Sequence, residues 1–519
     1  MWKNNKKKIQ KSRTINTIAN TAVGFIDKFL TVFLSFISRT VFIKVLGSEY
    51  LGINGLFTNI LSILSLAELG IENAIIYRLY KPISDNDEEK IAGLITYYKK
   101  LYFTIGIVVL TIGICLIPFL HFFVNIKQDI GNIYIYYIMF LANSVLSYFY
   151  IYKTAIVKAD QKEYKLKIIN SITTIVQFIL QIIVLVTLQN FYLYLAIKIV
   201  TAFITNVLSS KKAEKDYPYI NEKRYIDKSE KKEIWKNVKD MFLYQIGGVI
   251  LNNTDNILIS MIVGTAWVGI YSNYDMIFVA ITGFTSMIFT ATQASVGNLT
   301  TENNQKKNLE VFNVLTFLSF WVYGFCSICF AILFQDFISI WLGENYLLPL
   351  SVVLVCVLNY YIKGVLYPIW NFRFTIGLFK YTKYVMLIAS LINIVLSVVL
   401  GIEYGLFGIL IATAIARLVT TVWYEPYKLF KIFFKEKIFK YYIHQIVDFV
   451  VIIGTYLLMV GIISIIKVDN IYVGFIIKIL LCMIVPNIIF FIYKCRTKEF
   501  KYVVSKKNQI LHRNNEFNQ

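Results

Sequence analysis

The stretch that decides the fold is Val45–Ile53, Val-Leu-Gly-Ser-Glu-Tyr-Leu-Gly-Ile, which lies between two long apolar segments. A similar stretch returns at Ile262–Ile270, Ile-Val-Gly-Thr-Ala-Trp-Val-Gly-Ile, and both of its glycines fall at the same offset of 217 residues. A period this long is not that of a solenoid. It predicts a membrane protein made of two homologous halves with its ligand between them. Chance likeness of glycine-containing turns is the simpler alternative.

Composition places the chain in the membrane. The 519 residues are 57% hydrophobic and 16% charged, with a mean hydropathy of +0.62, whereas soluble proteins are about 45–50% apolar and 25% charged. Apolar runs of near twenty residues predict an all-α polytopic membrane protein with about 14 transmembrane helices, forming two pseudo-symmetric six-helix lobes plus two C-terminal helices. The expected spans are 17–46, 51–80, 101–124, 132–157, 168–188, 191–210, 241–263, 268–296, 311–335, 349–372, 384–401, 406–424, 446–466 and 471–493.

Basic residues predict the orientation. Of the 52 lysines and arginines, 42 lie in the two terminal segments and in alternate loops, whereas the opposite loops hold Lys127 and Lys467 alone. Because cytoplasmic loops carry the excess of basic residues, both termini are expected to be cytoplasmic, in a multi-pass protein of the cell (cytoplasmic) membrane. The same bias explains the net charge of +21, which matches anionic lipid headgroups and gives no reason to expect nucleic acid.

The loops predict the domains. The longest connection, 211–240, separates six spans from six and is expected to divide the lobes. The predicted segments are an N-lobe with spans 1–6 at 14–210, this cytoplasmic loop, a C-lobe with spans 7–12 at 241–424, an interfacial amphipathic linker at 425–445, spans 13 and 14 at 446–493, and a basic cytoplasmic tail at 494–519.

Charged residues inside spans are the candidates for function, because a charge in lipid costs roughly 2.5 kcal/mol or more unless it faces a cavity or a partner. Cations in a water-filled cavity suit a pyrophosphate. The candidate substrate-binding residues are Arg39, Lys28, Lys198, Lys363 and Arg417. The candidates for coupling to a proton or sodium ion are Asp255, Glu68, Glu72, Asn252 and Asn256.

Structural roles compete with these assignments. Lys28 has Asp27 as a local partner, and Glu68 and Glu72 have the option of capping buried amides between packed helices. Lys44 and Lys478 are better explained by snorkelling to an interface, and Arg78 by anchoring a cytoplasmic helix end.

No catalytic or cofactor motif stands out. The chain has no Walker loop, no His-Glu-x-x-His and no nucleophile elbow, so we expect no catalytic residues, no cofactor and no ATP hydrolysis on this chain. The three histidines are scattered and indicate no metal site. The six cysteines, including Cys326-x-x-Cys329, are expected to pack as small hydrophobic residues.

The sequence also resembles a known family. The stretch 45–71 and the segment Asn253-Thr-Asp255 followed by Ile262–Tyr271 resemble Wzx-type polysaccharide flippases of the multidrug/oligosaccharidyl-lipid/polysaccharide exporter superfamily. The resemblance implies alternating access by two six-helix lobes and transfer of an undecaprenyl-pyrophosphate-linked oligosaccharide from the inner to the outer leaflet, for assembly of cell-surface polysaccharide. It further implies exchange for H+ or Na+, contact with membrane lipids and a possible polysaccharide polymerase as partner. Arg39 is the position that best matches the family's pyrophosphate-binding cations.

Three other functions are alternatives for a chain of this kind. A cation-coupled multidrug antiporter of the same fold is expected to have a cavity dominated by acidic and aromatic residues, whereas the mid-span charges here lean basic. A glycan polymerase or ligase needs a sizeable external loop, and the longest one expected is only 336–348. A non-transporting scaffold of a glycan synthesis complex is compatible with the spans.

Overall fold

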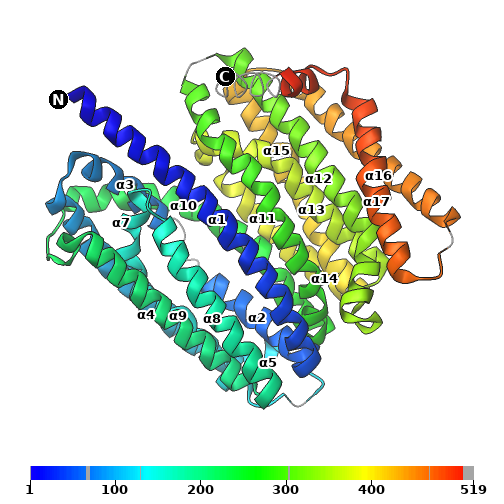
Figure 1. Ribbon diagram of the computed structural model, residues 1–519, viewed down its shortest axis with the longest axis horizontal. Coiled ribbons are helices and arrows are strands. Elements are labelled where there is room, and N and C mark those ends of the chain that lie inside the picture. The colour runs from blue at the N-terminus through cyan, green and yellow to red at the C-terminus, as the bar shows by residue number, and fades with distance from the viewer. Residues whose placement is uncertain (1, 66–70, 129, 302–303, 467, 506–519) are drawn as a thin grey trace, which may run out of the picture. The chain divides into compact units, whose positions relative to one another are not determined.

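The computed structural model describes residues 2–65, 71–128, 130–301, 304–466 and 468–505, and within these ranges the chain is helical with no β-strand. It forms two compact units, residues 1–272 and 273–519. The first unit contains α1 (Trp2–Leu46), α2 (Ser48–Leu64), α3 (Ile71–Asp85), α4 (Glu88–Leu116), η2 (Ile117–Phe119), α5 (Leu120–Phe123), α6 (Ile133–Tyr148), η3 (Ile151–Lys153), α7 (Thr154–Ala159), α8 (Tyr164–Leu188), α9 (Phe191–Asp216), η4 (Pro218–Asn221), α10 (Lys228–Leu258), η5 (Ile259–Val263) and the start of α11 (Thr265–Thr301) (Figure 1).

The second unit begins within α11. It continues with α12 (Gln305–Leu342), η6 (Glu344–Tyr346), α13 (Leu350–Thr375), α14 (Phe379–Val419), α15 (Thr421–Leu429), η7 (Phe430–Phe434), α16 (Phe439–Ile465) and α17 (Ile471–Lys494). The first unit thus holds all of the predicted spans 1–7, and the predicted lobe boundary within 211–240 stays a prediction.

The predicted all-α polytopic membrane fold is confirmed. Twelve helices in the described ranges are long and apolar enough to cross a membrane. The difference from fourteen arises at two places. The predicted span 51–80 is described as the separate helices α2 and α3, and the spans 384–401 and 406–424 form one continuous segment, Tyr381–Phe434.

That segment contains a sharp turn. Gly405 has φ 57° and ψ −134°, a conformation that favours glycine, and it divides α14 into two antiparallel arms. Asn393 Nδ2 donates to Thr413 Oγ1 across the arms at 2.8 Å, and Ser397 Oγ donates to the Ile409 carbonyl at 3.3 Å. The two predicted spans are therefore a helical hairpin.

The repeated glycine stretches contact each other in the first unit. A Cβ added to Gly52 would lie 1.9 Å from the Thr265 carbonyl oxygen, and one added to Gly269 would lie 2.1 Å from the Ser48 carbonyl oxygen. Ser48 and Thr265 occupy equivalent places in the two stretches, so the same contact is made twice in opposite directions. The glycines are needed because their backbones approach a neighbouring carbonyl too closely for any side chain.

Thr265 fixes this junction further. Its backbone N–H donates to the Asn125 carbonyl at 2.8 Å, and its hydroxyl accepts from the Asn125 N–H at 2.9 Å. Thr265 is completely buried. The second glycine stretch is thereby tied to the loop that follows α5 as well as to α2.

The predicted linker 425–445 has an apolar face, and this face packs on protein. Leu429, Phe430 and Phe434 join a buried cluster with Phe312 of α12 and Phe372 of α13. The exposed side of this segment carries lysines, at 431, 435, 437 and 440.

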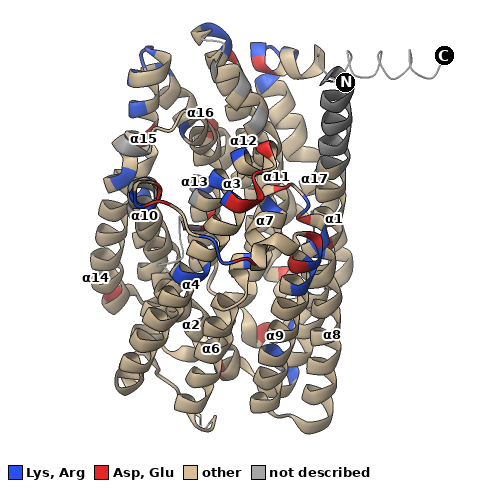
Figure 2. Ribbon diagram, turned by 90° about the vertical axis from the view of Figure 1, so that its left-hand side faces the viewer, with Lys and Arg blue, Asp and Glu red and all other residues tan. Residues whose placement is uncertain are grey.

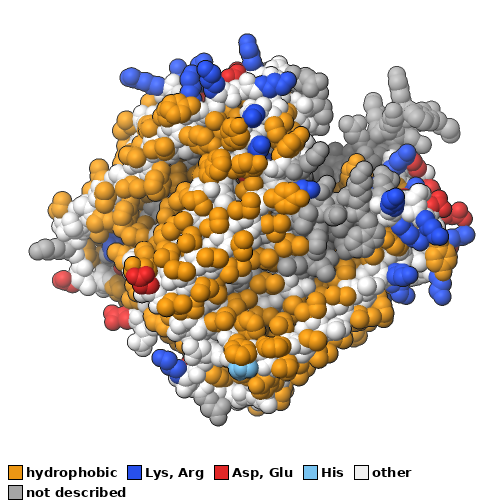
Figure 3. Space-filling model, turned by 180° about the vertical axis from the view of Figure 1, so that it is seen from behind, with side chains coloured by type: hydrophobic (Ala, Val, Ile, Leu, Met, Phe, Trp, Pro, Cys, Tyr) orange, Lys and Arg blue, Asp and Glu red, His pale blue; other side chains and the backbone are white. Residues whose placement is uncertain are grey.

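The surface fits a lipid environment. Apolar side chains cover most of the surface visible in Figure 3, and large apolar residues along α8, α16 and α17 are exposed. Charged residues gather around α3 (Figure 2), which packs against α4, α7 and α10. There Lys158 pairs with Glu72, and Lys90 lies 3.4 Å from Glu230.

Candidate functional site: a polar cavity in the first unit

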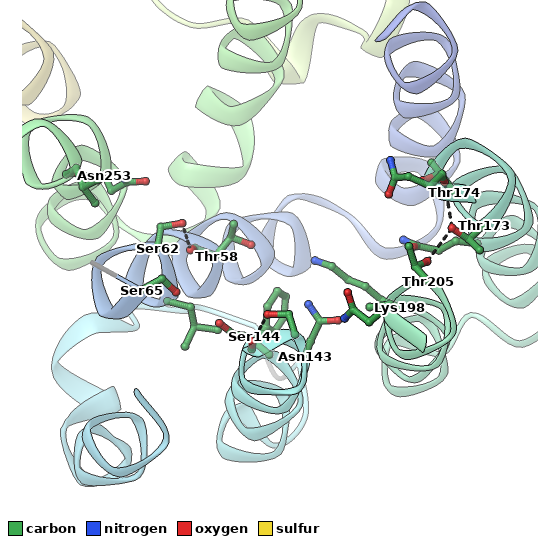
Figure 4. A pocket seen from close by; sticks show the side chains of 18 residues that line it. Thr58, Ser62, Ser65, Asn143, Ser144, Thr173, Thr174, Lys198, Thr205 and Asn253 are labelled. Carbon is green, nitrogen blue, oxygen red and sulfur yellow. Dashed lines mark hydrogen bonds between the residues drawn. The ribbon is translucent and has the colours of Figure 1, made fainter. Parts of the chain in front are cut away.

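A cavity of about 630 Å³ lies inside the first unit among α2, α6, α8, α9 and α10 (Figure 4). Eighteen of the described residues line it. Thirteen of them are neutral polar residues: Thr58, Ser62, Ser65, Asn143, Ser144, Ser147, Asn170, Thr173, Thr174, Gln177, Thr205, Asn206 and Asn253. The other five are Leu61, Phe140, Ala202, Val249 and Lys198. A polar hollow bounded by apolar helices is the kind of place in which a membrane protein holds a hydrophilic ligand.

Helical periodicity places these polar residues together. On α8, Asn170, Thr173, Thr174 and Gln177 have the spacing i, i+3, i+4, i+7, which puts them on one face of an otherwise apolar helix. The Thr205 hydroxyl of α9 donates to Thr173 Oγ1 at 2.7 Å. The polar face of α8 is therefore turned toward α9 and the cavity and away from lipid.

Many hydroxyl groups already use their proton within their own helix. Thr58 Oγ1 donates to the Asn54 carbonyl at 2.6 Å, and Ser62 Oγ donates to the Thr58 carbonyl at 2.9 Å. A hydroxyl that donates in this way keeps its oxygen lone pairs as acceptors. Thr58 and Ser62 consequently offer the cavity acceptors for a ligand that donates hydrogen bonds.

Lys198 is the one charged residue among the described residues that line the cavity. Its side chain extends from α9 into the hollow (Figure 4), and its Nζ lies 5.0 Å from the centre of the Phe140 ring. In the described part of the chain, no carboxylate pairs with this amine. Burying an unpaired charge is costly, so a ligand that brings a negative charge would be favoured here.

The other two predicted cations of the first unit are on α1. The Arg39 guanidinium donates from Nη1 to Ser272 Oγ at 2.8 Å, so it joins α1 to α11. Lys28 is partly buried. Its neighbour Asp27 accepts a hydrogen bond from Ser171 Oγ of α8 at 2.6 Å, and within the described residues Asp27 and Lys28 form no ion pair. Neither cation lines the cavity.

The remaining two predicted cations are in the second unit. Lys363 lies on α13 and is partly buried. Arg417 lies near the end of α14, with only 6% of its surface exposed.

The predicted ion-coupling residues have diverse surroundings. Glu72 pairs with Lys158 of α7. On α10, Asn252 is exposed and donates to the Gly248 carbonyl at 2.6 Å, whereas Asp255 and Asn256 are partly buried and do not line the cavity. Glu68 lies outside the described residues.

The prediction from sequence concentrated on charges and so missed most of this cavity. Asn253, one residue from the predicted Asn252, is the residue of α10 that lines the cavity together with Val249. The four polar residues on one face of α8 could have been found from the sequence, because polar residues on one face of a membrane span need a polar neighbour.

The fold is that of a polytopic helical membrane protein with a polar cavity, and similarity to known proteins agrees with this class. The sequence profile described as "Polysaccharide biosynthesis protein" matches residues 17–293. The chain belongs to this polysaccharide biosynthesis protein family, which confirms the family likeness seen in the sequence. No curated protein matches the chain by sequence.

Solved structures share the fold. The lipid II flippase MurJ in an inward closed conformation is similar with a TM-score of 0.66 and 19% identity, over 92% of this chain and 98% of that one. An inward-facing multidrug resistance MATE family transporter of the MOP superfamily is similar with a TM-score of 0.57 and 14% identity, over 76% of this chain and 93% of that one. The MATE transporter VcmN of Vibrio cholerae is similar with a TM-score of 0.57 and 11% identity, over 82% of this chain and 100% of that one. These similarities establish a fold that flippases and transporters share.

Proposed function

We propose that this protein is a flippase that moves an undecaprenyl-pyrophosphate-linked oligosaccharide from the inner to the outer leaflet of the cytoplasmic membrane, with both termini cytoplasmic. The observation that carries the proposal is the cavity of the first unit: the described residues that line it include thirteen neutral polar residues and one lysine, and no carboxylate is among them. Membership of a polysaccharide biosynthesis family supports a glycan as the cargo.

The alternative is a cation-coupled multidrug antiporter of the same fold. A site for organic cations gains affinity from carboxylates and aromatic faces. Among the described residues that line the cavity, Phe140 is the one aromatic residue, and none is acidic. This lining favours an anionic or hydroxyl-rich cargo.

We assign the lipid's pyrophosphate to cations within the spans, with Arg39 as the first position to test and Lys28, Lys363 and Arg417 after it. Transport is coupled to H+ or Na+, and Asp255, with Glu68, Glu72, Asn252 and Asn256, is the group of residues in which to look for that coupling. A polysaccharide polymerase that uses the delivered cargo is the proposed partner.

The test is a flipping assay with the full chain in proteoliposomes. A lipid-linked oligosaccharide is built into both leaflets, and a lectin that cannot cross the membrane reports the fraction accessible from outside. The protein should let inner-leaflet cargo reach the lectin, and Arg39→Ala should insert normally but stop this transfer. A scaffold protein would leave the inner fraction inaccessible, and unchanged transfer by Arg39→Ala would remove Arg39 from the site.

A further inference from the structure

The cavity of the first unit has the chemistry of a saccharide site. Its hydroxyls include several that donate within their own helices, such as Thr58, Ser62 and Ser147, and their free lone pairs match the many hydroxyl donors of a sugar. Its amides supply both donors and acceptors. The Asn143 side-chain oxygen is buried and has no hydrogen-bond partner among the described residues, which is a cost that a bound donor would relieve after a small side-chain movement.

The charge of the cavity argues against the pyrophosphate as its main ligand. Lys198 is a single point charge with three donors. A pyrophosphate brings more than one negative charge and several acceptor oxygens, which recognition sites usually satisfy with several cations or a helix N-terminus. One lysine instead balances one negative charge. The ligand that fits the lining is neutral over most of its surface and anionic at one place.

The size of the cavity agrees with this chemistry. Sites for small molecules range over about 300–1,000 Å³, and the volume here is about 630 Å³. A volume of this size accommodates a few sugar rings.

We propose that this cavity binds the saccharide part of the cargo and that the cargo carries an acidic sugar whose single negative charge pairs with Lys198. The inference rests on the proposed function and deepens it, because it specifies the sugar class and assigns the cavity to the glycan. The pyrophosphate is then bound by other residues.

Binding to the purified full chain in nanodiscs tests this proposal. Three probes are compared by calorimetry at up to millimolar concentration: a glucose–glucuronic acid disaccharide, the matching neutral glucose disaccharide, and inorganic pyrophosphate. The acidic disaccharide should bind at least tenfold more tightly than the neutral one. Lys198→Gln should abolish this preference and leave the neutral disaccharide within about twofold, whereas Lys198→Arg should retain it. Asn143→Ala should weaken both sugars to a similar degree.

Three results would overturn the proposal: no saturable binding of either disaccharide, pyrophosphate as the probe whose affinity depends on Lys198, or an equal loss for both sugars in Lys198→Gln. Size-exclusion profiles establish that each variant is folded. If Lys198→Gln does not fold, the binding preference of Lys198→Arg tests the proposal in its place. These results are separate from the flipping assay. A wild-type chain that flips lipid-linked oligosaccharide but binds sugars without regard to charge would refute the acidic-sugar site and leave the flippase function standing.

Discussion

The junction of the two glycine stretches leads to a quantitative prediction for Gly52→Ala. The added methyl carbon would lie 1.9 Å from the Thr265 carbonyl oxygen, 2.8 Å from its carbonyl carbon and 2.9 Å from its Cγ2. Favourable separations are about 3.5–4.0 Å, so α2 and the start of α11 must move apart by roughly 1.5 Å at this point. Overpacking of this kind costs about 1–3 kcal/mol, occasionally more. The loss exceeds the roughly 0.4–1 kcal/mol that an alanine contributes by restricting the unfolded chain.

A series of glycines gives the matched controls. Gly248 of α10 has no neighbouring atom within 4 Å of an added Cβ, and Gly55 of α2 has only Val268 Cγ1, at 3.2 Å. Gly248→Ala should be neutral or slightly stabilising, and Gly55→Ala should fall between it and Gly52→Ala. Gly269→Ala should resemble Gly52→Ala, because its added Cβ would meet the Ser48 carbonyl oxygen at 2.1 Å.

The assay is the apparent melting temperature of the detergent-solubilised protein, read as the fraction that stays monodisperse after heating. Membrane proteins of this size often unfold irreversibly, so all variants are heated at one rate and compared with one another. If Gly52→Ala were as stable as Gly248→Ala, the close approach between the two stretches would be refuted. The order Gly52 below Gly55 below Gly248 is the result that the geometry requires.

Three further predictions concern topology and ion pairs. Reporters fused after residue 220 in η4 and after residue 342 at the end of α12 should lie on opposite sides of the membrane, cytoplasmic and external, as the basic-residue bias demands; activity on one side for both would contradict the orientation. Glu425→Ala should cost about 3–5 kcal/mol of stability and sharply reduce the monodisperse fraction, because it leaves a buried charge on Arg373 without the Glu425 carboxylate. In the native pair, Arg373 Nη1 lies 2.6 Å from Glu425 Oε2, and the two side chains are 7% and 0% exposed. The combined change Arg373→Met with Glu425→Leu should recover much of the lost stability, because it removes both charges. Glu72→Lys should cost at most about 1 kcal/mol of stability and so lower the melting temperature slightly, because the pair with Lys158 is partly exposed. Adding Lys158→Glu should restore the melting temperature. A double variant that is stable yet no longer responds to a proton or sodium gradient would instead assign Glu72 to coupling.

The sequence by itself determined the fold class. Twenty-residue apolar runs have few stable solutions in lipid, because every backbone hydrogen bond must be made within the segment. The 217-residue repeat identified the two glycine stretches, and the predicted spans 384–401 and 406–424 left a short turn between them, where Gly405 divides α14. These are local properties, and local patterns determine them.

Only the tertiary structure decided which polar residues share a cavity. Lys198 was one of five candidate cations in the sequence, and no sequence feature placed it in a polar cavity ahead of the other four. The fold directs the Lys198 side chain into the polar cavity, whereas it directs the Arg39 side chain to Ser272. A helical period fixes the face on which a side chain lies, but the packing of five helices decides whether that face meets a neighbour, lipid or a cavity.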